Sequence, residues 1–277
     1  MAKRKRIINE RIIKKRLKEG RGQGRGADYR PWLRIQDVPS QGLSTRIKGW
    51  KTGRCHHFLS KLECQYFYIL EWSSIVSDIR EQYPLELSET LEIAERLGIK
   101  HPTDPRTRQP IVMTTDFVNT VDRQGKLIDH ARSIKYSREL SSDRALEKLE
   151  IERVYWTERE IDWGVVTEHE MEPVLAANVS WVHAYREATA LSPLTDKIIR
   201  RIETVLTPRV NKQQAPLRDL TDVCDDHLGL SPGASLSVVR HLIANKRWQV
   251  DMKRPLNTAR PLAFLTAATS GKKVSKK

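Results

Sequence analysis

The chain has 277 residues, a formal net charge of +14 and a sequence pI near 9.8. Its length predicts one or two domains, and a hydrophobic content of 39% is enough for buried cores. No run of about 18 apolar residues exists, which excludes a transmembrane helix, and no apolar segment marks the N-terminus as a secretory signal.

The basic charge is concentrated at the two ends of the chain. Residues 1–26 hold 11 Lys or Arg and two Glu, and the last six residues read KKVSKK. We expect a basic N-terminal arm (1–26) and a basic tail (269–277) that bind nucleic acid, the alternative being solvated tails. A short helix is predicted within 1–19, and the glycines of 20–26 end it. The residues expected to contact DNA are Lys14, Lys15, Arg16, Arg21 and Arg25.

The glycine-rich segment 20–26 has two interpretations that the sequence leaves open. It is either a flexible linker or a backbone that approaches DNA phosphates closely. The three cysteines of the chain are an odd number without a Cys-x-x-Cys pair, so neither a disulfide framework nor a zinc ribbon is supported. This usage fits a reducing cytoplasm.

A first domain is predicted over residues 27–170 as a mixed α/β sheet flanked by helices. Helical spacing favours helices over 57–72, over 86–99, ending at Gly98, and over 141–161, starting near Ser142 or Asp143. Strands are predicted over 73–85, 111–121, 127–136 and 163–168, with a proline-rich loop at 101–110. A second domain over 171–268 is predicted to be mainly helical and winged-helix-like. Its helices are expected at 192–206, 217–230 and 231–248, followed by a strand at 248–256.

Glu63 departs from the pattern of its own helix. It lies on an apolar stripe, four residues from both Leu59 and Phe67, where an ionised carboxylate is costly unless a cation pairs with it. The alternative is a capping box in which Ser60 and Glu63 satisfy each other's backbone amides.

The two strands around DRQGK predict a hairpin whose turn is centred on Gln124-Gly125. In that register Asp116 faces Ser133, and Lys135 is its diagonal neighbour on the same face of the sheet. A carboxylate and an ammonium group then meet at one site; the alternative is an ordinary cross-strand ion pair. Glu152, on a helical face with Leu149 and Trp156, is either a fourth group of this site or a solvated glutamate.

Acids on a helix and a strand, followed by a lysine on the next strand, form the frame of a metal-dependent nuclease. Glu63 and Asp116 can hold Mg²⁺, with Mn²⁺ as a substitute, and Lys135 can position a water molecule. The residues alone therefore predict a Mg²⁺-dependent DNA hydrolase.

Several blocks in one order resemble the TnsA family, the endonuclease subunits of heteromeric cut-and-paste transposases. They cover most of residues 15–185 and include KEGRGQGRGADYRPWL, KTGRCHHFLSKLE, WSSIVSDIREQYPL, TTDF and LEKLEIERVYW. The resemblance implies a restriction-endonuclease-like fold, catalytic roles for Glu63, Asp116, Lys135 and Glu152, and a metal ligand in the backbone carbonyl of Ile134. Ser133 departs from the family pattern, which often has glutamine there, and this puts a second metal position in question.

The resemblance also implies partners and a place of action. The family cuts the 5′ ends of the transposon in double-stranded DNA, while an RNase H-like transposase subunit cuts and joins the 3′ ends. An AAA+ ATPase regulator is bound through the C-terminal domain, and the protein works without a membrane in the bacterial cytoplasm, associated with the nucleoid. A stand-alone restriction-like or junction-resolving endonuclease and a non-catalytic DNA-binding adaptor are the alternatives.

Overall fold

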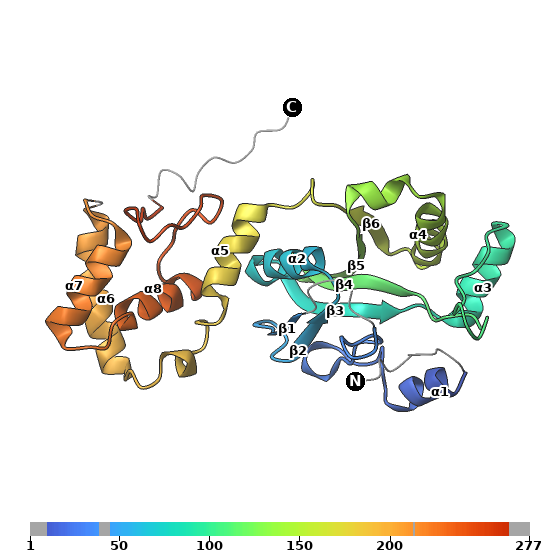
Figure 1. Cartoon of the computed structure of the whole chain (residues 1–277), viewed down its shortest axis with the longest axis horizontal. Coiled ribbons are helices and arrows are strands. Elements are labelled where there is room, and N and C mark those ends of the chain that lie inside the picture. The colour runs from blue at the N-terminus through green and yellow to red at the C-terminus, as the bar shows by residue number, and fades with distance from the viewer. Residues whose placement is uncertain (1–9, 39–44, 213, 266–277) are drawn as a thin grey trace. The chain divides into compact units, whose positions relative to one another are not determined.

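A computed structural model describes residues 10–38, 45–212 and 214–265 (Figure 1). The first part of the chain is built around a four-stranded sheet. The chain divides into two compact units, residues 1–171 (unit 1) and 172–277 (unit 2), where the sequence predicted a boundary between residues 170 and 171. The mixed α/β character of unit 1 and the helical character of unit 2 are confirmed.

The central sheet has the strand order β3-β4-β5-β6. Its first three strands are antiparallel neighbours and β6 joins β5 in parallel. The strands are β3 (Val76–Pro84), β4 (Thr114–Arg123), β5 (Lys126–Ile134) and β6 (Asp162–Val166). A separate two-stranded sheet pairs β1 (Thr45–Lys48) with β2 (Cys55–Phe58). The helices of this unit are α1 (Glu10–Lys18), η1 (Gly26–Asp28), α2 (Lys61–Trp72), α3 (Leu87–Arg96), η2 (Ser137–Ser141) and α4 (Asp143–Thr157).

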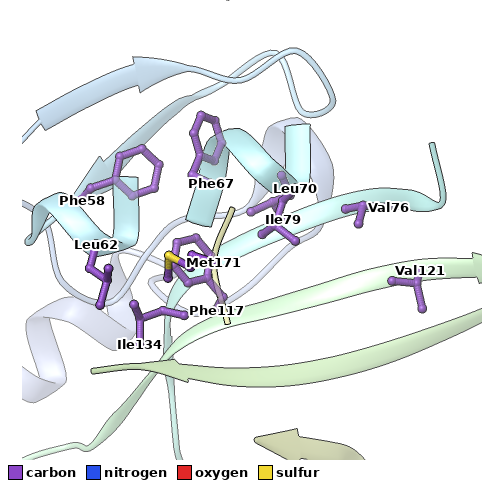
Figure 2. Packing of buried hydrophobic residues seen from close by; sticks show 10 residues of the cluster. All are labelled: Phe58, Leu62, Phe67, Leu70, Val76, Ile79, Phe117, Val121, Ile134 and Met171. Atoms are coloured by element: carbon purple, nitrogen blue, oxygen red, sulfur yellow. The ribbon is translucent and has the colours of Figure 1, made fainter. Parts of the chain in front are cut away.

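Side chains that alternate along β4 build a core on each face of the sheet. Phe117 is fully buried in a cluster with Phe58 of β2 and Phe67 of α2, and Figure 2 shows this cluster between α2 and the strands. The next residue, Val118, belongs to a second cluster with residues of α3 and α4. Burying each large apolar side chain contributes about 1.5–3 kcal/mol, so the two clusters fix α2 and α4 on opposite faces.

The predicted helix over 57–72 was wrong at its start. Residues 55–58 form β2, and α2 begins at Lys61 because the Ser60 hydroxyl caps it by accepting the Glu63 amide at 3.1 Å. Thr52, His56 and Glu81 form a hydrogen-bonded chain that ties β2 to β3, with Thr52–His56 at 2.7 Å and His56–Glu81 at 2.8 Å. This long-range partner outweighs the local helical spacing.

Of the two interpretations of the glycine-rich segment 20–26, the flexible linker is contradicted by the packing around Gly22. Gly22 has φ +81° and donates its amide to the Arg30 carbonyl at 2.6 Å, and a Cβ at this position would lie 2.2 Å from Pro84. The segment 20–26 is therefore packed on the protein rather than free, and only glycine fits at position 22. Residues 1–9 of the arm and the basic tail at 269–277 lie outside the described residues.

The described residues of unit 2 form five helical segments joined by loops. These are α5 (Pro173–His183), η3 (Ala188–Leu191), α6 (Asp196–Asn211), α7 (Leu217–Leu228) and α8 (Ala234–Ala244). The sequence prediction missed α5, and the strand predicted at 248–256 is reduced to one bridge between Val250 and Phe264 among the described residues. Asn178 of α5 donates its amide to the carbonyls of Met252 and Arg254, which ties the segment predicted as a strand to this helix. Among the described residues, no helix of either unit has both the length and the apolar character needed to cross a bilayer.

Candidate active site

Glu63 lies in the first turn of α2 and is buried, with 6% of its surface exposed. Its carboxylate accepts the amide of Leu59 at 3.0 Å, so the reciprocal bond of a capping box to Ser60 is replaced by one to the preceding residue. Burial, followed by the nearby Asp116 carboxylate, raises the pKa of Glu63 to about 7. A cation between the two carboxylates would relieve this repulsion.

The β4–β5 hairpin forms in the predicted register. Gln124 and Gly125 both have positive φ, 58° and 83°, as a tight two-residue turn requires, and Phe117 pairs with Arg132. Asp116 lies one residue beyond this pair, and its Oδ2 accepts the Ile134 amide and the Lys135 ammonium, both at 2.7 Å. The predicted meeting of a carboxylate and an ammonium group is therefore present.

Lys135 bridges two oxygens that were expected to bind metal, one from the residue pattern and one from the family resemblance. Its Nζ lies 2.7 Å from Asp116 Oδ2 and 3.1 Å from the Ile134 carbonyl oxygen. Burial is the largest single influence and lowers the pKa of this lysine, but the carboxylates of Asp116, Glu152 and Glu63 together outweigh it and raise the pKa above its ordinary value. The group therefore remains a cation and is suited to stabilising negative charge rather than accepting a proton.

Glu152 of α4 is buried at the edge of the same site, so the interpretation as a solvated glutamate was wrong. Its Oε1 accepts the hydroxyl of Thr115 at 2.6 Å and that of Ser133, and Thr115 in turn accepts the Trp156 indole N–H at 2.7 Å. Burial, followed by Asp116, raises the pKa of Glu152. The serine that departs from the family pattern thus anchors Glu152.

Gln82 of β3 is a member of this site that sequence reasoning missed. Its Nε2 lies 3.4 Å from Glu63 Oε2 and 3.4 Å from Asp116 Oδ1. The residue is 2% exposed and has φ +49°, a conformation uncommon outside glycine. No local pattern marks a glutamine in the middle of a strand, because its partners come from elements distant in sequence.

The donor set fits a hard divalent cation. Carboxylate oxygens of Glu63 and Asp116 converge on one nitrogen, and the Ile134 carbonyl shares Lys135 with Asp116. In the described parts of the chain, no three His, Cys, Asp or Glu side chains are grouped to hold one ion. That is compatible with Mg²⁺, which is often bound by one or two carboxylates and otherwise keeps water.

The residues expected to bind DNA differ in their exposure and in their ion pairs. Arg16 and Arg21 are buried and paired with Asp37, so their side chains are not available to phosphates. Arg25 is 61% exposed but donates to Asp129 at 2.9 Å. Lys14 and Lys15 remain exposed, at 77% and 74%. Sequence alone missed these pairings because Asp37 and Asp129 lie outside the local pattern.

Comparison with known proteins extends the resemblance seen in the sequence. The family model of the TnsA-like endonuclease N terminal matches residues 73–168, which include Asp116, Lys135 and Glu152. The model of the TnsA endonuclease C terminal matches residues 170–252. The chain is also 42% identical over 250 residues to the transposon Tn7 transposition protein TnsA of Escherichia coli, covering 88% of this chain and 87% of that protein. The chain belongs to the TnsA family of transposon endonucleases.

Proposed function

We propose that this endonuclease hydrolyses the phosphodiester bond at the 5′ ends of its transposon with Mg²⁺ as cofactor, Mn²⁺ serving as a substitute. The observation that supports it most directly is the convergence of Glu63, Asp116 and Lys135 on one site at the end of the β4–β5 hairpin. Glu63, Asp116 and the Ile134 carbonyl would hold the cation. When bound, Mg²⁺ supplies Lewis-acid polarisation of the scissile phosphate and stabilises the leaving 3′ oxygen.

The protein's own groups account for the remaining steps. The Lys135 ammonium, held by Asp116, orients the attacking water and offsets the negative charge that develops on the phosphate. Glu152, fixed by Thr115 and Ser133, adds a further negative charge beside Lys135 and so helps to keep the lysine protonated. Attack on phosphorus leaves a 5′ phosphate and a 3′ hydroxyl.

We further propose a division of labour with partner proteins in the bacterial cytoplasm. An RNase H-like transposase subunit cuts and joins the 3′ ends, and an AAA+ ATPase regulator binds unit 2. The relative from Escherichia coli is named as a transposition protein, which supports work in such a system.

Strand-specific cleavage of a labelled transposon end, with and without the partner transposase, tests the proposal. We expect 5′-strand cuts that require Mg²⁺ and the partner. Efficient cutting of both strands by this protein alone would favour a stand-alone endonuclease. No cutting under any condition would favour a non-catalytic adaptor.

A further inference from the structure

The Gln82 carboxamide forms hydrogen bonds with three side chains of the active site. Its Nε2 lies 3.4 Å from a carboxylate oxygen of Glu63 and 3.4 Å from one of Asp116. Its Oε1 accepts the hydroxyl of Thr114 at 3.1 Å, which fixes the amide with the N–H groups toward the two acids. An amide nitrogen therefore lies where the two carboxylates converge.

The backbone of Gln82 is held in this position against its conformational preference. A φ of +49° is sterically unfavourable for a residue with a side chain. The Gln82 carbonyl accepts the Trp32 amide at 3.1 Å. On its two sides, Glu81 is fixed by Arg54 and His56, and Tyr83 packs on Trp156. Strain that is maintained by so many contacts is typical of functional sites.

We propose that Gln82 is a positioning residue whose carboxamide holds the place of a divalent cation between Glu63 and Asp116, and that metal binding displaces it. The inference rests on the proposed Mg²⁺ site. An N–H pair between two carboxylates offers each of them a donor, as a cation would, and keeps them together when no metal is bound.

A second group in the site supports the same interpretation. The Lys135 ammonium lies between Asp116 Oδ2 and the Ile134 carbonyl, just as the Gln82 amide lies between Asp116 Oδ1 and Glu63. Asp116 Oδ1 thus shares the Gln82 amide with Glu63, and Asp116 Oδ2 shares the Lys135 ammonium with the Ile134 carbonyl. Because distances of 3.4 Å are at the weak end for hydrogen bonds, the neutral amide is the donor that gives way more easily.

The test is Mn²⁺ binding to the full-length protein, measured by electron paramagnetic resonance without DNA. Gln82→Met replaces the amide by an apolar group of similar length and removes the competitor, so the Mn²⁺ dissociation constant should fall about fivefold to tenfold. Thr114→Val releases the amide oxygen and should shift the constant in the same direction by a smaller factor. Gln124→Met is the matched control, since this exposed residue also has positive φ (58°) and lies in the hairpin turn.

The outcomes separate this inference from the site on which it rests. An unchanged or weaker affinity in Gln82→Met would overturn the inference, and a merely structural role predicts weaker binding because the ligands would be less well placed. If Gln82→Met does not fold, the direction of the shift in Thr114→Val decides. Absence of Mn²⁺ binding to the wild type, or equal binding to Asp116→Ala, would overturn the metal site and the inference together.

Discussion

Glu63 is expected to destabilise the metal-free protein above about pH 7. Its pKa of about 7 in the folded chain compares with an ordinary value of 4.5. A carboxyl group with a raised pKa binds more protons in the folded state, so its unfavourable contribution is absent below about pH 4.5 and fully present above about pH 7. At 1.36 kcal/mol per pH unit, the difference amounts to about 3 kcal/mol.

The variant Glu63→Gln isolates the cost of ionising this buried carboxyl group, because it keeps the shape of the side chain and removes its charge. Urea unfolding is followed by tryptophan fluorescence in the presence of a chelator between pH 5 and pH 8.5. Near pH 5 the variant and the wild type should have similar free energies of unfolding. At pH 8 the variant should be more stable by up to about 3 kcal/mol, although its cleavage activity is lost.

Metal and a control variant complete the experiment. Saturating Mg²⁺ should stabilise only the wild type and reduce or reverse the difference, because a ligand stabilises the state that binds it. Glu95→Gln, on the exposed part of α3, should follow the wild type at every pH. Equal stabilities of Glu63→Gln and wild type across the whole range, or a less stable variant at pH 8, would refute the argument from burial.

Four further predictions concern the other groups. Asp116→Ala should abolish 5′-strand cleavage in Mg²⁺ while circular dichroism shows an intact fold; retained 5′ cuts would contradict its role. Lys135→Ala should lower the single-turnover rate at saturating Mg²⁺ by at least about 100-fold with little change in the Mg²⁺ midpoint, and a near-wild-type rate would remove the lysine from the mechanism. Replacing both Lys14 and Lys15 by Ala should reduce the slope of log K against log salt concentration for DNA binding by up to about 2, and an unchanged slope would contradict their contact with phosphates. Arg21→Ala should lower the free energy of unfolding by about 2–3 kcal/mol, and an unchanged stability would contradict its structural role.

The sequence by itself determined the parts of this protein that depend on short-range chemistry. The Gln124-Gly125 turn set both the hairpin and its register, and this register predicted that Asp116 and Lys135 meet. The apolar stripe on α2 made Glu63 visible as a charge out of place. Turn geometry and side-chain periodicity act over a few residues, so they can be interpreted without knowing the rest of the fold.

Only the tertiary structure decided which polar groups those residues contact. Arg16 and Arg21, which the sequence assigned to DNA, are paired with Asp37, and Ser133, which departs from the family pattern, donates to Glu152. Gln82 reaches the site because β3 lies beside β4, an arrangement that no local pattern encodes. Pairing of buried polar groups depends on which segments the apolar core brings together, because each group must find a partner wherever packing places it.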